Sequence, residues 1–139
     1  MPISGRILII DDEAALRQTF TRILRQAGWE VTTAGDGPEA LELLKSSAYD
    51  LAYLDIHLPG MNGVDVLKEL HRRFPQMPVI LFTAHASLET ALPAIRLGAA
   101  DYLIKPIDPE ALIARTRIAL TEQAALRHMN ELRAQIEAL

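Results

Sequence analysis

Short apolar runs alternate with segments of helical periodicity along the chain, and this alternation constrains the fold more than any other feature. The strand-like runs are residues 6–10, 29–33, 50–54, 79–82 and 102–104. The segments of helical periodicity are residues 14–27, 38–46, 64–74, 88–97 and a long stretch from 109 onward. Strict alternation of this kind predicts an α/β fold with five parallel strands and five helices, the helices covering both faces of the sheet. The sequence does not decide the strand order, and we take the doubly wound, flavodoxin-like order 2-1-3-4-5 as the expected one.

Glycine and proline mark the ends of these segments. Gly28 and Gly98 follow helical stretches, as C-terminal caps do, and Asp108 with Pro109 is a typical helix start. Pro93 lies inside the helical pattern 88–97, where a proline costs about 3 kcal/mol because it removes a hydrogen bond. Two interpretations stay open: a kinked or late-starting helix, or a helix that is weak because it belongs to a surface that moves.

The composition excludes several classes of protein. Half of the 139 residues are hydrophobic, which suffices for a sizeable core, and the net charge of −4 argues against a nucleic-acid surface in this segment. The absence of cysteine excludes disulfides and thiolate metal sites. No apolar run approaches the ~18 residues of a membrane span, and the N-terminus does not resemble a signal peptide. We therefore expect a cytoplasmic protein without membrane contact.

Polar residues stand where four of the apolar runs end. They are Asp11 with Asp12, Asp55, Thr83 and Lys105. Because the carboxyl ends of parallel strands meet at one edge of an open sheet, we expect three carboxylates, a hydroxyl and an ammonium group to converge there. Three carboxylates alone would repel one another, and a hard divalent cation such as Mg²⁺ relieves that repulsion.

Four segments resemble the receiver domains of two-component response regulators, the group that includes the chemotaxis receivers. The matching segments are residues 9–13, 54–63, 81–84 and 98–106, in the family's order and spacing. The resemblance covers roughly residues 5–120. It implies a phosphorylation-controlled switch that is not an enzyme in the ordinary sense, since it catalyses only its own phosphorylation and dephosphorylation.

The resemblance assigns the phosphorylation chemistry to named residues. Asp55 is implied to accept a phosphoryl group from the phosphohistidine of a sensor histidine kinase. Asp11, Asp12 and Asp55, with the main-chain carbonyl of His57, are implied to hold Mg²⁺. A first-turn acid such as Glu13 either ligates through water or only favours the helix dipole, and both interpretations stay open.

The same resemblance assigns a switch. Lys105, Thr83 and Ala84 are implied to contact the phosphoryl group, and Tyr102 to swing inward when Thr83 moves. Pro106 is implied to follow a cis peptide bond. The surface of the fourth helix, fifth strand and fifth helix is then expected to change and to control an output domain or a partner protein.

Two histidines depart from the common pattern of this family. His57 lies two positions after the phosphate acceptor, and His85 lies two positions after Thr83. Our hypothesis is that both flank the entrance for water and tune the lifetime of the phosphoryl group. The simpler interpretation, histidines in solvated loops, stays beside it.

We expect a receiver domain at residues 1–120 and a helical extension or linker at 121–139. Met129, Leu132, Ile136 and Leu139 follow 3-4-3 spacing, as in a short coiled-coil seam. The extension is interpreted either as a linker helix toward an output domain, with pairing in a homodimer, or as a frayed tail. The chain ends without a stop signal, so we expect a fragment of a longer regulator, and residues 91–107 resemble receivers of the nitrogen-regulation activator class.

Three other functions compete with this interpretation. A phosphatase of the haloacid dehalogenase type needs a second aspartate where His57 stands. A flavodoxin-like carrier of FMN needs a phosphate loop after the first strand, where the acidic residues 11–13 would repel phosphate. A stand-alone receiver that docks to a partner is not separated from a linked one by this sequence.

Overall fold

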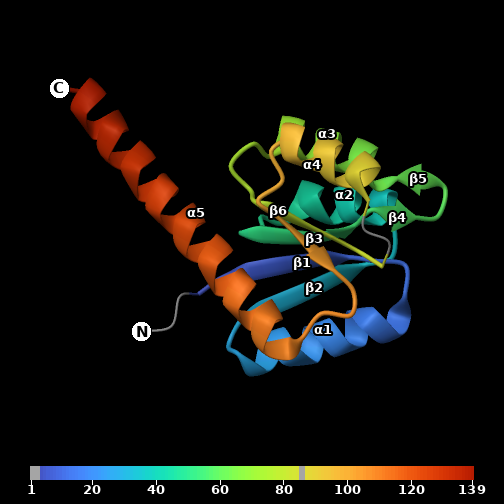
Figure 1. Cartoon of the computed structure of the whole chain (residues 1–139). Helices are drawn as coiled ribbons and strands as arrows, with labels where there is room; N and C mark the ends of the chain where they lie inside the picture. The colour runs from blue at the N-terminus through green and yellow to red at the C-terminus, as the bar shows by residue number, and fades with distance from the viewer. Residues whose placement is uncertain (1–3, 85–86) are drawn as a thin grey trace.

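A parallel sheet forms the centre of the computed structural model, which describes residues 4–84 and 87–139 (Figure 1). Its five strands are β1 (Arg6–Ile10), β2 (Glu30–Ala34), β3 (Leu51–Asp55), β6 (Val79–Thr83) and β7 (Asp101–Ile104). Their order across the sheet is β2-β1-β3-β6-β7, and every neighbouring pair is parallel. The doubly wound order expected from the sequence is therefore confirmed.

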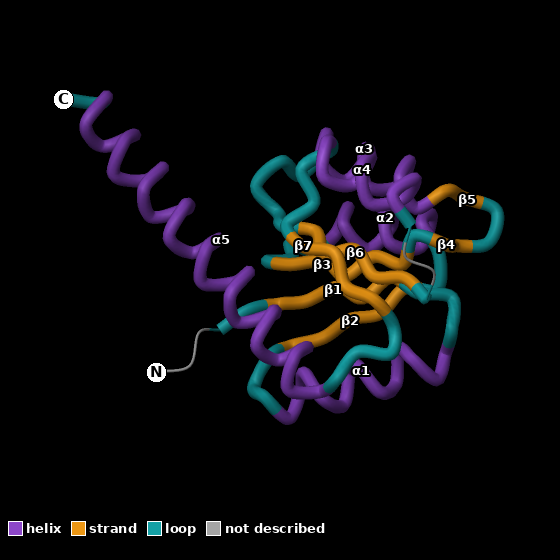
Figure 2. Tube along the Cα trace, viewed as in Figure 1, coloured by secondary structure: helices purple, strands orange, loops and turns teal. Residues whose placement is uncertain are grey.

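Helices cover both faces of this sheet. The five helices are α1 (Ala14–Gln26), α2 (Gly37–Ser46), α3 (Gly63–Arg73), α4 (Leu88–Arg96) and α5 (Pro109–Glu137). Figures 1 and 2 show α1 and the first part of α5 on one face, and α2, α3 and α4 on the other. The predicted positions of all five helices are confirmed, with ends that differ by a residue or so.

The helix ends follow the local chemistry of the sequence. Asp108 accepts a hydrogen bond from the Ala111 amide at 3.2 Å, so it caps α5 as predicted. Gly28 and Gly98 both have positive φ, the conformation that ends a helix and favours glycine. α4 begins at Leu88 and continues through Pro93, so the expectation of a late-starting helix is wrong.

The segment after β3 contains a second, smaller sheet. It forms a small antiparallel hairpin of β4 (His57–Leu58) and β5 (Met61–Asn62). The chain reverses at Gly60, whose φ of 69° is in the left-handed region. Strands of two residues have no alternating pattern to reveal them, which is why the sequence did not predict this hairpin.

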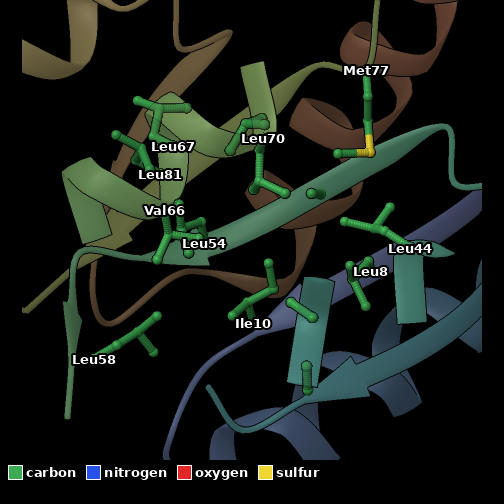
Figure 3. Packing of buried hydrophobic residues seen from close by; sticks show 14 of the residues in the cluster. Leu8, Ile10, Leu44, Leu54, Leu58, Val66, Leu67, Leu70, Met77 and Leu81 are labelled. Atoms are coloured by element: carbon green, nitrogen blue, oxygen red, sulfur yellow. The ribbon is translucent and has the colours of Figure 1, made fainter. Parts of the chain in front are cut away.

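Alternate strand residues divide the core into two clusters, one on each side of the sheet. From β1, Leu8 and Ile10 face the side of α2, α3 and α4, while Ile7 and Ile9 face the side of α1 and α5. Figure 3 shows the first cluster, in which strand side chains meet those of α2 and α3. All four residues of β1 named here are completely buried, so the strand is fixed from both faces.

Apolar packing and several polar contacts hold α5 against the body of the fold. The buried hydroxyl groups of Tyr53 and Thr116 share a hydrogen bond, and burial raises the pKa of Tyr53, so the phenol stays neutral. Further along, Arg127 forms an ion pair with Asp50 at 3.2 Å.

In the described part of the chain, no helix combines the length and the apolar character needed to cross a membrane.

The start of α3 lies close to the end of β3, and Gly63 permits this approach. A Cβ atom at Gly63 would lie 2.5 Å from both the Cα and the carbonyl oxygen of Ile56. We expect Gly63→Ala to lower the free energy of unfolding by about 1–3 kcal/mol, because backbone atoms cannot yield as side chains do. Urea denaturation measures this.

Gly35→Ala is the matched control. Its new Cβ would meet only side-chain ends, those of Arg17 and Glu39, at 3.5 Å. Equal unfolding midpoints for the two variants would contradict this account of Gly63.

Candidate functional site

Four strands end at the same edge of the sheet, and each carries one of the predicted polar residues there. Asp55 is the last residue of β3 and Thr83 the last residue of β6. Asp11 directly follows β1, and Lys105 directly follows β7. Because β1, β3, β6 and β7 are neighbours in this order, their C-terminal ends form one continuous edge.

Lys105 connects the two buried carboxylates of this edge. Its Nζ lies 3.0 Å from Oδ2 of Asp11 and 3.1 Å from Oδ2 of Asp55. A third carboxylate, that of the exposed Glu13, lies 3.4 Å away. The ammonium group also lies 5.1 Å from the centre of the Phe82 ring, a cation–π distance. One cation therefore holds together residues from the ends of β1 and β3.

Burial and pairing act in opposite directions on these charges. Burial raises the pKa of Asp11 to about 6, although hydrogen bonds from the Glu13 amide and from Lys105 act to lower it. Burial by itself would lower the pKa of Lys105, but its hydrogen bonds to Asp11 and Asp55 outweigh burial and raise it. Above pH 7 the Asp11 carboxylate is therefore ionised beside the charged ammonium group of Lys105.

The Asp55 side chain is held in one orientation. It is 3% exposed. Its Oδ1 accepts a hydrogen bond from the main-chain amide of His57 at 3.0 Å, and its Oδ2 accepts from Lys105. A carboxylate whose two oxygens both accept hydrogen bonds keeps a fixed orientation. That orientation favours its reaction with a group bound next to it.

The acidic cluster offers oxygen ligands for a metal. One carboxylate oxygen each from Asp11, Asp12, Glu13 and Asp55 can be chosen so that all lie within 4.8 Å of one another. Asp12 and Glu13 are exposed, whereas Asp11 and Asp55 are buried. A donor set made only of carboxylates, partly open to water, fits Mg²⁺, which prefers oxygen and keeps several waters.

The remaining predicted residues lie around this cluster. Thr83 is completely buried, and its carbonyl oxygen accepts a hydrogen bond from the Lys105 amide at 2.7 Å. Ala84 follows it and is exposed. Tyr102 is partly buried and packs against the core cluster on the side of α2, α3 and α4. The peptide bond between Lys105 and Pro106 is cis, as expected.

Of the two histidines in the sequence hypothesis, the structure describes one. His57 lies in β4 with an exposed side chain, and its amide reaches Asp55. His85 lies outside the described residues.

Sequence reasoning missed two contacts of the site. Arg17 of α1 donates to the main-chain oxygen of Asp11 at 2.7 Å and so fixes the loop after β1. Glu13 was considered as a ligand or a helix-dipole residue, but its contact with Lys105 was not predicted. The only sequence signal for these contacts was that Arg17 lies one helical turn after Glu13. This spacing indicates a contact with the loop after β1 only once the packing of α1 against the sheet is known.

Known proteins share this sequence pattern and this fold. The sequence model of the response regulator receiver domain matches residues 7–117. The alginate biosynthesis transcriptional regulatory protein AlgB of Pseudomonas putida is 42% identical over 135 residues, covering 97% of this chain but 29% of AlgB. The DNA-binding transcriptional regulator NtrC of Escherichia coli is 39% identical over 117 residues, covering 84% of this chain and 25% of NtrC. The chain thus spans less than a third of the length of these regulators.

Solved structures agree with the sequence relatives. A CheY-like receiver domain protein from Methanospirillum hungatei superposes with a TM-score of 0.84 at 36% identity, covering 86% of this chain and 96% of that one. NtrX from Brucella abortus superposes with a TM-score of 0.88 at 36% identity, covering 94% of this chain and 30% of that one. The chain belongs to the response regulator receiver domain family.

Proposed function

We propose that this receiver domain is phosphorylated on Asp55 by a sensor histidine kinase, with Mg²⁺ at the adjacent acidic cluster. The observation that carries the proposal is the arrangement of Asp55, a buried carboxylate oriented by the His57 amide and paired with Lys105 at 3.1 Å. An aspartate held next to a cation is suited to form an acyl phosphate, a known nucleophilic role of this side chain.

The reaction exchanges one bond to phosphorus for another. A carboxylate oxygen of Asp55 bonds to phosphorus as the bond from phosphorus to the donor nitrogen breaks, and the released histidine recovers a proton. Lys105 lies where it neutralises charge on the phosphoryl oxygens. Water attack on phosphorus later releases inorganic phosphate and restores the carboxylate, so the domain acts only on itself.

Asp11, Asp12 and Asp55 are the side chains we assign to Mg²⁺, together with the main-chain carbonyl of His57. Bound Mg²⁺ supplies positive charge that offsets the clustered carboxylates and the oxygens of the transferring group. The exposed carboxylates of Asp12 and Glu13 leave the cluster open to solvent on one side. Lys105 and the Glu13 amide orient the Asp11 carboxylate for this role.

Phosphorylation adds about −1.5 to −2 charges in one step, and we assign the response to β7 and its neighbours. Thr83 ends β6 and Ala84 follows it, and both would contact the phosphoryl oxygens. Movement of Thr83 would open space for Tyr102, which already packs partly into the core. The switch would then alter the surface of α4, β7 and α5.

We assign α5 beyond residue 120 to communication with an output domain, and place the receiver at residues 1–120. The buried residues of α5 end at Leu120, whereas Met129, Leu132 and Ile136 are exposed large hydrophobic residues. AlgB and NtrC, named as transcriptional regulators, extend far beyond the part that this chain matches. A helix with such an apolar stripe is suited to pair with a second copy.

Membership of the receiver family sets aside the alternatives of an FMN carrier and a dehalogenase-type phosphatase. The position two residues after Asp55, which the phosphatase would need as an aspartate, is His57 on the hairpin strand β4.

The first prediction concerns the acceptor. Incubation with acetyl phosphate and Mg²⁺ should add one phosphoryl group to the wild-type chain, detected by intact mass, and none to Asp55→Asn, because an amide is a poor nucleophile. Asp65→Asn, which changes an exposed acid in the first turn of α3, is the control and should be labelled normally. An adduct that persists in Asp55→Asn would refute the assignment.

The second prediction concerns Lys105. Lys105→Met should strengthen Mg²⁺ binding, because the ammonium group competes for the same carboxylates, and should slow phosphorylation at least about tenfold through loss of charge stabilisation. Calorimetry at pH 8, where Asp11 is ionised, measures the first effect and timed intact mass the second. Lys68→Met removes an exposed lysine of α3 as control. Mg²⁺ affinity and rate both equal to wild type would contradict the role of Lys105.

The third prediction concerns the switch. Thr83→Ala should still be phosphorylated, but the amide chemical-shift changes along β7 should fall below about half of the wild-type changes, because the hydroxyl that senses the phosphoryl group is gone. Thr121→Ala, at an exposed threonine of α5, is the control. Shift changes of full size in Thr83→Ala would assign the switch elsewhere.

A further inference from the structure

A groove of about 880 Å³ lies between α1 and β2. It contains none of the residues assigned to the phosphoryl group or to Mg²⁺. Figure 2 shows α1 running beside this strand at the border of the sheet. The residues that line the groove are Ala14, Arg17, Gln18, Thr21, Arg22, Arg25, Gln26, Val31, Thr32 and Thr33. Those from α1 recur every three or four positions, so one whole face of the helix forms a wall.

The groove is positively charged although the chain is acidic overall. Arg17, Arg22 and Arg25 line it, and no aspartate or glutamate of the described part of the chain does. Among residues 4–84 and 87–139, none of these three arginines forms an ion pair, whereas Arg6, Arg72, Arg73, Arg115 and Arg127 all do. For a chain of net charge −4, three arginines without acidic partners on one wall form a local site for negative charge.

The opposite wall is an open strand edge. β2 is the outermost strand and pairs with β1 alone. The Glu30 amide donates to Gly5, and the Ala34 carbonyl oxygen accepts from Asp11, so these residues face β1. Because the direction alternates along a strand, Val31 and Thr33 turn their amide and carbonyl groups away from β1, toward the groove.

Arg25 joins the two walls. Its Nη2 donates to the Val31 carbonyl oxygen at 3.0 Å. A guanidinium group has five N–H donors in a planar fork, so the others stay available to a carboxylate lying beside the strand. Arg22, one turn earlier on α1, is exposed and belongs to the same wall.

We propose that this groove binds an extended acidic segment of a partner polypeptide, which adds to the sheet alongside β2. The Val31 amide and the outward amide and carbonyl groups of Thr33 would pair with the backbone of the segment, as in other cases of strand addition. Arg22 and Arg25 would pair with its carboxylates. Backbone pairing supplies the general affinity, and the arginines select acidic sequences over neutral ones.

The test uses the full chain and a fluorescein-labelled peptide of alternating glutamate and threonine, followed by fluorescence anisotropy at low salt. Arg22→Gln should weaken binding about threefold, the size expected for one exposed ion pair, and Arg22→Gln with Arg25→Gln about tenfold. Arg22 forms no hydrogen bond or ion pair with the other described residues, so Arg22→Gln tests its charge without disturbing the fold. Arg133→Gln, on the exposed part of α5, carries the same change of charge and should bind as wild type.

Amide chemical shifts locate the bound peptide. We expect the amides of Val31 and Thr33 to shift and to become protected from hydrogen exchange, and a peptide with glutamine in place of glutamate to bind at least about tenfold more weakly. The proposal is overturned if wild type does not bind, if the double variant binds equally, or if these two amides do not respond. Tighter binding of a single-stranded oligothymidine at the same residues would overturn it in favour of a nucleic-acid site.

Discussion

The ammonium group of Lys105 lies between two buried carboxylates that would otherwise repel each other, and the rest of the site is built around this contact. Asp11 and Asp55 come from different strands, and each lies about 3 Å from the same nitrogen. Burial raises the pKa of Asp11, and the hydrogen bonds from the Glu13 amide and from Lys105 act against burial. The ammonium group contacts oxygens of Asp11 and Asp55, two of the carboxylates that a divalent cation in the proposed site would use.

Lys105 is positioned by its backbone as well as by its side chain. Its amide donates to the Thr83 carbonyl oxygen, so the end of β7 is fixed to the end of β6. β6 lies between β3 and β7, with all five of its residues buried. The main chain of Lys105 is thus anchored next to a buried strand, and its side chain starts from a fixed point, which is the positioning that the proposed phosphoryl transfer would need.

The sequence predicted the parts of this protein that depend on local pattern. Continuous apolar runs marked the strands, and the polar residues directly after them marked the edge where Asp11, Asp55 and Lys105 meet. The β4–β5 hairpin was missed because its strands have two residues each and depend on the turn at Gly60. The contact of Arg17 with the Asp11 carbonyl was missed for another reason. It requires the packing angle of α1, which no periodicity in the chain specifies. The α1–β2 groove likewise required the strand order, since only that order makes β2 an edge.

α5 runs from the C-terminal ends of the strands, near Lys105, to their N-terminal ends, near Asp50. The helix starts four residues after Lys105, is held at mid-sheet by the hydrogen bond between Tyr53 and Thr116, and pairs through Arg127 with Asp50 before β3. The Arg127 pair is exposed and hence weak, while the Tyr53 contact is buried and resists breaking. A rotation of α5 would therefore break an exposed ion pair, that of Arg127 with Asp50 or that of Arg115 with Asp101, before the buried contact at Thr116. The exposed side chains of Met129 and Leu132 lie beyond all of these contacts, on the part of α5 that extends past its buried residues.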